Sequence, residues 1–243
     1  MGGRTAAEVS PQVYARTGGW LYLLIFVTGF ISMTLQSGIV VSGDPAATAA
    51  HLMGLQNQWR LSIVSELITF SCDIPLAVIF FILLRPVNPA LSLLSAFFRF
   101  AEAVIGCAIV ALHVVPLLLL GGGAYLKAVD SHELQTFALL SIKLYNYAFG
   151  IALVPFGIHC VLLGYLIFKS TYLPKAFGVL LVLAGFAYVV NSFALLAVPA
   201  IAGVTFIAMF ATGISAEIGL TLWLIVFGVN VARWNERTNA APA

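Results

Sequence analysis

The sequence is poor in charge: only 8% of its 243 residues are Asp, Glu, Lys or Arg, and the formal net charge is +2. Soluble domains carry roughly 25% charged residues, so this chain has too few to cover a water-facing surface. Its basic residues form no cluster of the kind that binds phosphate backbones, which argues against a nucleic-acid partner. Because 62% of the residues are hydrophobic, we expect the lipid bilayer to be both solvent and partner.

Cysteine is also scarce, and the three residues present, Cys72, Cys107 and Cys160, all fall inside apolar segments. An odd number of buried thiols indicates packed side chains rather than a disulfide framework. The sequence contains no HExxH zinc motif, no phosphate-binding loop and no GxSxG nucleophile elbow. It therefore predicts no metal site and no cofactor, and it assigns no enzymatic activity.

Long apolar runs recur along the whole chain, and they lack the alternating period of barrel strands. They predict an all-α, polytopic transmembrane helical bundle with about six spans. Segmentation at Pro, Gly and charged residues places the spans near 18–40, 61–84, 90–120, 134–168, 176–198 and 204–231. We therefore expect a single transmembrane domain over 18–231, between an N-terminal segment 1–17 and a disordered C-terminal tail 232–243.

Two features describe the ends of the spans. Asp44 before Pro45 is a helix-start signal, and it predicts an extracytoplasmic interfacial helix near 45–59. Lys and Arg in short loops stay on the cytoplasmic side, which predicts that both termini are cytoplasmic. The basic residues assigned to that face are Arg4, Arg16, Arg85, Lys169, Lys175, Arg233 and Arg237, against Arg60 and Lys127 on the other.

Three strings carry a family resemblance: YARTGGWLYLL, CDIPLAVIFFILLRPVNPALSLLSAFFR and GIHCVLLGYLIFKSTYLPKAFGVLLVLAGFAY. They resemble a bacterial integral-membrane family known as domain of unknown function 4386, roughly from Tyr14 to Asn230. The resemblance implies a compact multi-pass protein of the bacterial cytoplasmic (inner) membrane. It brings no catalytic residues with it.

The informative residues are polar groups inside the predicted spans, because a charged side chain at a helix centre costs about 2.5 to 3.5 kcal/mol on insertion scales. At a rise of 1.5 Å per residue, six of them lie roughly 13 to 22 Å from the cytoplasmic end of their helices. These candidates for ligand binding or proton relay are Asp73, Arg99, Glu102, His159, Asn191 and Glu217. A second set, nearer the predicted outer face, contains Glu66, His113 and Lys143, with Asn146 beside them.

The spacing of residues along the third and fourth spans predicts which side of each helix packs against the rest of the bundle. Ser92, Ser95, Arg99, Glu102, Gly106 and His113 share one face of the third span, which should point into the bundle. Gly150, Gly157 and Gly164 recur every seven residues on the fourth span and predict close packing against another helix.

Three functions are compatible with this pattern. The first is a protein that binds or translocates a small polar solute or protons through the mid-membrane charges. The second is an intramembrane enzyme resembling a lipid hydrolase, with His113 or His159 as its base and Asp or Glu orienting it. The third is a structural, sensor or assembly subunit, in which Arg99 merely pairs with a carboxylate to hold the bundle together. An oligomer is compatible with all three.

Overall fold

The structure, a computed structural model, describes residues 10–240, and this part of the chain is helical without strands. Six segments are long and apolar enough to cross a membrane, as the sequence predicts. The elements are α1 (Pro11–Gln36), α2 (Pro45–Gly54), α3 (Gln56–Leu84), α4 (Pro89–Ile109), α5 (Ala111–Leu120), the 3-10 turn η1 (Ala124–Leu126), α6 (Ser131–Lys169), α7 (Lys175–Ala197), α8 (Pro199–Val226) and α9 (Val231–Ala240).

Several helices begin at a side-chain cap. Asn88 accepts a hydrogen bond from the Leu91 amide at 3.0 Å, and Pro89 occupies the first helical position of α4. Asp44 caps α2 in the same way, as expected. The expected helix 45–59 ends earlier, however, at Gly54. Trp59 belongs to α3, where it is fully buried and donates from Nε1 to the His113 carbonyl at 2.8 Å.

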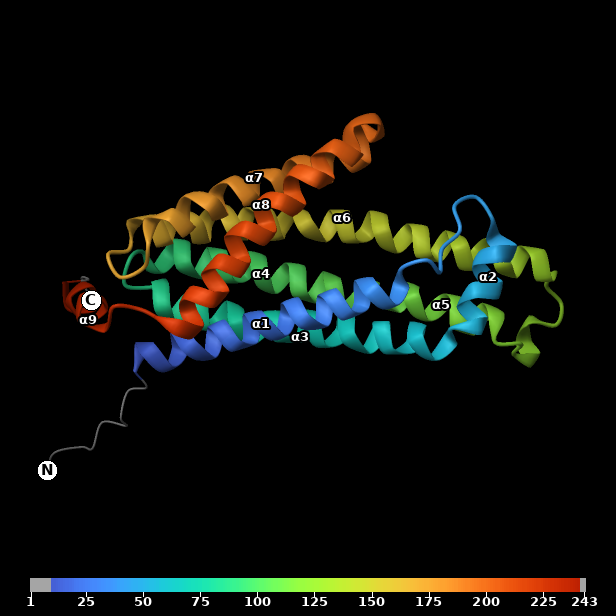
Figure 1. Cartoon of the computed structure of the whole chain (residues 1–243), viewed down its shortest axis with the longest axis horizontal. Helices are drawn as coiled ribbons and strands as arrows, with labels where there is room; N and C mark the ends of the chain where they lie inside the picture. Colours follow the sequence, from blue (N-terminus) through green and yellow to red (C-terminus); the bar gives the residue numbers. More distant parts are fainter. Residues whose placement is uncertain (1–9, 241–243) are drawn as a thin grey trace, which may run out of the picture.

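The six spans close into a ring. Each packs mainly against two others, in the order α1, α3, α4, α6, α7, α8 and back to α1. Figure 1 shows α1, α3, α4 and α6 running side by side, while the α7–α8 hairpin lies over them and α8 crosses back to the start of α1. The short helices α2 and α5 complete the far end of the bundle beside α6. In such a ring, each of the six spans has one face that points into the interior of the bundle.

Glycines allow the closest approach, between α6 and α7. A Cβ on Gly164 would meet the backbone nitrogen of Val182 at 2.8 Å, and one on Gly157 would meet the Gly185 carbonyl oxygen at 2.7 Å. The stripe predicted on the fourth span is therefore a helix-packing face, and its partner is α7.

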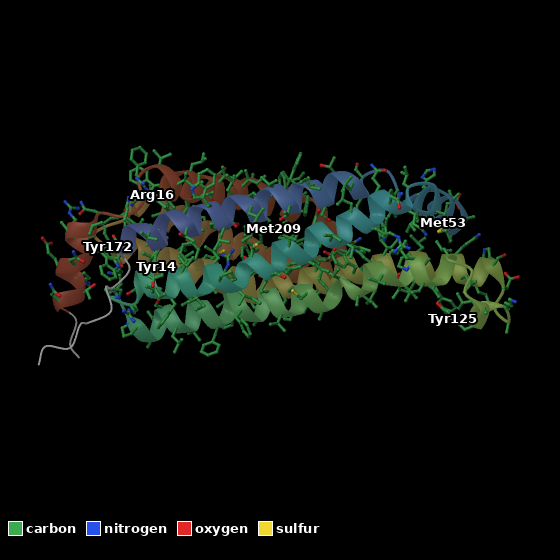
Figure 2. The ribbon with its side chains drawn as sticks, turned by 90° about the horizontal axis from the view of Figure 1, so that it is seen from below. Tyr14, Arg16, Met53, Tyr125, Tyr172 and Met209 are labelled. Carbon is green, nitrogen blue, oxygen red and sulfur yellow. The ribbon has the colours of Figure 1, made fainter. Side chains whose placement is uncertain are left out.

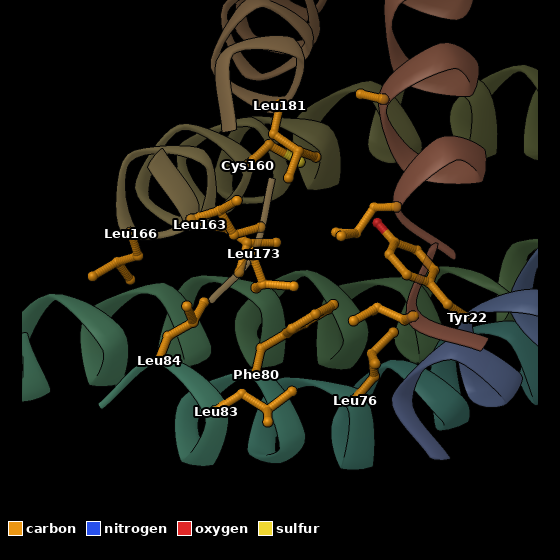
Figure 3. Close-up of a cluster of buried hydrophobic side chains, with 14 of the residues drawn as sticks. Tyr22, Leu76, Phe80, Leu83, Leu84, Cys160, Leu163, Leu166, Leu173 and Leu181 are labelled. Carbon is orange, nitrogen blue, oxygen red and sulfur yellow. The ribbon is translucent and has the colours of Figure 1, made fainter. Parts of the chain in front are cut away.

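The apolar core divides into two clusters along the bundle. The larger lies between α1, α3, α6, α7 and α8, and Figure 3 shows Leu76 and Phe80 of α3 directed toward Cys160 and Leu163 of α6. The smaller lies toward α2 and α5 and includes Trp59, Phe70 and Leu117. Phe149 packs against both. The opposite sides of the spans carry many exposed Phe, Leu, Ile and Val side chains, as expected for surfaces in contact with lipid.

One end of the bundle is closed by the C-terminal helix. The sequence predicts a disordered tail over 232–243, but α9 is helical through Ala240. Residues 1–9 and 241–243 lie outside the described part. Trp234 Nε1 and the Tyr172 hydroxyl both donate to the Leu83 carbonyl, at 2.9 and 2.8 Å. Burial raises the pKa of Tyr172, which keeps its hydroxyl a donor. The hydrogen bond from Trp234 holds the polar helix α9 against the end of α3.

Labelled residues identify the two ends of the bundle. Tyr14, Arg16 and Tyr172 lie at the α9 end, and Met53 and Tyr125 lie at the other (Figure 2). We call the latter the distal end. The expected boundaries of the domain at 18 and 231, and the cytoplasmic position of the α9 end, remain predictions.

Candidate functional site

All six spans contribute a polar side chain to one buried cluster at mid-bundle. We call it the central cluster, and except for the half-buried Tyr188 each member is at most 5% exposed. Its members are Tyr22 on α1, Asp73 on α3, Arg99 and Glu102 on α4, His159 on α6, Tyr188 on α7 and Glu217 on α8.

Arg99 organises the cluster. Its Nη2 forms an ion pair with Asp73 Oδ1, and its Nη1 lies 3.1 Å from His159 Nε2. The guanidinium carbon lies 4.9 Å from the centre of the Tyr22 ring and 5.5 Å from that of Phe156. These aromatic faces favour a cation in a region with little water. The expected pairing of Arg99 with a mid-membrane carboxylate is therefore present, with Asp73 as the partner.

The contact with Arg99 determines the hydrogen-bonding state of His159. A guanidinium can only donate, so Nε2 must accept and the hydrogen must reside on Nδ1. Nδ1 lies 2.9 Å from both the carbonyl oxygen and the hydroxyl of Ser95. With Nδ1 protonated and Nε2 occupied, His159 is poorly placed to remove a proton from the Ser95 hydroxyl. This geometry disfavours the lipid-hydrolase alternative at His159.

Glu217 is held by two tyrosines from neighbouring helices. The Tyr22 hydroxyl donates to Oε2 at 2.7 Å, and the Tyr188 hydroxyl donates to Oε1 at 2.6 Å. The bonds connect α8 to α1 and α7 across the ring. Neither tyrosine was predicted as a site residue, because a tyrosine in a membrane helix commonly marks the interface rather than the centre. Their position within long apolar runs was the available signal.

Glu102 lies one helical turn beyond Arg99 on the same face of α4, and it is 4% exposed. Its Oε2 has no hydrogen-bond partner among the described residues, and neither has Arg99 Nε. Buried polar atoms are nearly always paired in native proteins. The Glu102 carboxylate is therefore an exception within the cluster, because Asp73 and Glu217 both have side-chain partners.

The cluster contains more acidic than basic groups. Asp73, Glu102 and Glu217 face a single guanidinium, so full ionisation would leave two unbalanced negative charges in a buried region. The free energy of such an arrangement is high, since isolated buried charges are strongly disfavoured. A proton or another positively charged group would restore the balance.

Asn191 is the predicted central residue that the structure places elsewhere. It lies on α7 one turn from Tyr188, but its Oδ1 accepts a hydrogen bond from Thr205 of α8 at 3.0 Å. This bond joins the two arms of the α7–α8 hairpin. The direction of its side chain depends on how the hairpin packs, which the spacing within one helix does not determine.

Two members of the predicted second set meet. His113 Nδ1 lies 3.0 Å from Glu66 Oε2, and Glu66 Oε1 accepts hydrogen bonds from Gln36 at 2.6 Å and Ser32 at 3.0 Å. The Tyr145 ring stacks on the His113 imidazole at 3.6 Å between centroids. We call Ser32, Gln36, Glu66 and His113 the distal cluster, because it lies toward the α2 and α5 end of the bundle.

The third member of that set, Lys143, is exposed on the outside of α6, as is Asn146. Both lie away from the interior face that carries Tyr145. A lysine near the end of a long helix can extend toward the interface, so it needs no buried partner. Among the described residues, no group of three His, Cys, Asp or Glu side chains is arranged to hold a metal ion, and the three cysteines are free thiols.

The ring of six apolar helices around a buried charged centre defines a multi-pass membrane protein with a polar interior. Residues 17–228 match the family described as domain of unknown function 4386, and the chain belongs to this family. An uncharacterised protein from Archaeoglobus fulgidus is 33% identical over 130 residues, which cover 54% of this chain and 64% of that protein, slightly under two thirds of its length. No solved structure matches the chain.

Proposed function

We propose that this chain binds a proton, or a small polar solute that carries a positive charge, at the central cluster and moves it across the membrane. The observation that carries the proposal is that every span of the ring supplies a polar side chain to one buried centre with three carboxyl groups and one guanidinium. Ionisable groups at this depth commonly mark ion or proton pathways in membrane proteins.

Two further features support binding over a purely structural role. A single ion pair between Asp73 and Arg99 would be enough to join α3 to α4. The cluster also contains Glu102, one oxygen of which has no partner within residues 10–240. Buried ion pairs often stabilise a fold no better than apolar residues of the same volume. Pro75 and Pro155 lie inside α3 and α6 near Asp73 and His159. Each removes a backbone hydrogen bond, which leaves the helix easier to bend there.

The test is cation flux into liposomes that contain the purified protein. Internal pH, followed with a trapped dye under an imposed membrane potential, reports protons, and uptake of labelled methylammonium reports a small cationic solute. We expect flux of one of the two above that of protein-free vesicles, and a loss of roughly tenfold or more in Glu102→Gln. This substitution removes a charge without breaking a hydrogen bond of Oε2.

Glu133→Gln is the matched control, because Glu133 is an exposed carboxylate at the start of α6. It should leave the flux unchanged. Thermal unfolding in detergent shows whether each variant is folded. Absence of both fluxes in the folded wild-type protein, or equal flux in Glu102→Gln and wild type, would overturn the proposal and favour the structural or assembly role.

A further inference from the structure

The distal cluster resembles the central cluster in having a buried polar atom without a partner. His113 is 1% exposed, its Nδ1 faces Glu66, and its Nε2 has no hydrogen-bond partner among the described residues. A carboxylate that orients one imidazole nitrogen leaves the other free to accept a proton or to bind a donor. The titratable group that packs on the pair from α6 is Tyr145, and from α1 the facing groups are Ser32 and Gln36, which do not titrate.

The unpartnered atoms lie along one line of the structure. Arg99 Nε, Glu102 Oε2 and His113 Nε2 belong to the single polar face that continues from α4 into α5. Their spacing follows helical turns, with Gly106 between Glu102 and His113. Three buried unpaired polar atoms on one face are unusual, since more than nine in ten such groups are paired in native structures. Two of them belong to the central cluster and the third to the distal cluster.

An aromatic layer lies between the two clusters. Phe70 of α3 lies between Glu66 and Asp73 on the same buried face, and these two positions are about 10 Å apart along the helix axis. Its ring sits directly on Gly106, where a Cβ would overlap it. Phe149 of α6 completes the layer, with its ring centre 6.4 Å from that of Phe70 and 6.1 Å from that of Tyr145.

Resting on the proposed function, we infer that the distal cluster is a second binding station for the same positively charged species, and that Phe70 seated on Gly106 is the closed barrier between the two stations. The missing side chain at Gly106 is what lets the ring fill the space between α3 and α4. A polar layer, an aromatic layer and a second polar layer then follow one another along the interior. Apolar constrictions of this kind gate membrane pathways by excluding water.

The barrier is tested by Phe70→Ala in the same liposome assay. Removing the ring joins the two polar layers, so we expect flux to rise by roughly tenfold. Phe97→Ala is the matched control: Phe97 lies on α4 and is 61% exposed, and its removal should change nothing. If Phe70→Ala does not fold, Phe70→Leu decides the question with a smaller expected rise. Flux equal to wild type in the folded variant overturns the barrier.

The distal station is tested by Glu66→Gln, which keeps the size of the side chain and removes its charge. We expect flux to fall as far as in Glu102→Gln. His113→Asn, which can place a donor near the position of Nδ1 but has no Nε2, should lose flux as well. If Glu102→Gln abolishes flux while Glu66→Gln and Phe70→Ala match wild type, the proposed function stands and this inference fails. If neither the wild-type protein nor any of the variants shows flux, the proposed function itself fails.

Discussion

At the scale of single residues, Arg99 shows how the bilayer interior selects side-chain chemistry. Its planar guanidinium contacts a carboxylate, an imidazole and aromatic faces at the same time. A lysine ammonium has neither the fork geometry nor the flat surface that these partners use. The cluster is therefore built around the shape of an arginine as well as its charge.

Removing one partner of the ion pair should cost more stability than removing both. Arg99→Met leaves Asp73 buried without its cation, a loss of about 3 to 5 kcal/mol, whereas Asp73→Leu combined with Arg99→Met leaves an apolar contact. Thermal unfolding can be followed with a thiol-reactive dye, because Cys160 is fully buried in the folded protein. We expect the double variant to unfold at a higher temperature than the single one. Equal unfolding temperatures for the single and the double variant would show that an unpaired Asp73 does not destabilise the protein.

At the scale of helices, the same residue type serves different purposes in different places. Gly164 and Gly178 let the backbones of α6 and α7 touch, whereas Gly106 accommodates an aromatic ring of α3. Gly203 on α8 faces open space, with no heavy atom within 4 Å of an added Cβ. A glycine in a membrane helix is therefore informative only together with what packs against it.

Gly164→Leu should separate α6 from α7. Its side chain would enter the backbone of α7, where an added Cβ already meets Val182 N at 2.8 Å. Overpacking of this kind costs about 1 to 3 kcal/mol, so the unfolding temperature should fall clearly. Gly203→Leu makes the same chemical change at an open position of α8 and should leave the midpoint near that of the wild type. A similar fall in both variants would contradict close packing at Gly164.

At the scale of the whole molecule, the ring order explains why distant parts of the chain share one site. Tyr22 and Glu217 are 195 positions apart, yet their hydrogen bond closes the ring between α1 and α8. An even number of spans also places the start of α1 and the helix α9 at one end, together with Arg16. Charge asymmetry predicts that this end is cytoplasmic.

Cysteine labelling in intact cells tests this orientation. In a background without Cys72, Cys107 and Cys160, single cysteines replace Ala128 in the distal loop and Asn235 in α9, both of which are exposed. A membrane-impermeant maleimide should label position 128 in intact cells and position 235 only after the membrane is opened. The reverse pattern would show that the termini face outward.

The spans and the inward face of α4 could be predicted because both are local properties. Apolar runs set the number of spans, and the spacing of Ser95, Arg99 and Glu102 set the face, which is buried as predicted. The helix α9 was not predicted because its sequence is polar and its side chains bind distant backbone groups, the carbonyls of Leu83 and Thr171. No pattern within residues 231–240 indicates that these carbonyl groups, far away in the sequence, are their hydrogen-bond partners.

The residues of this chain determined by themselves that it is a six-span membrane protein and that several charges lie inside its spans, because hydropathy is a property of each segment. Only the tertiary structure decided which charges meet: Asp73 pairs with Arg99, Glu217 with two tyrosines and Glu66 with His113, while Lys143 and Asn191 lie elsewhere. These pairings depend on how each helix is rotated and on which helix stands beside it. Such choices are made by packing between segments far apart in sequence, and the glycines and aromatic rings at the interfaces select among them.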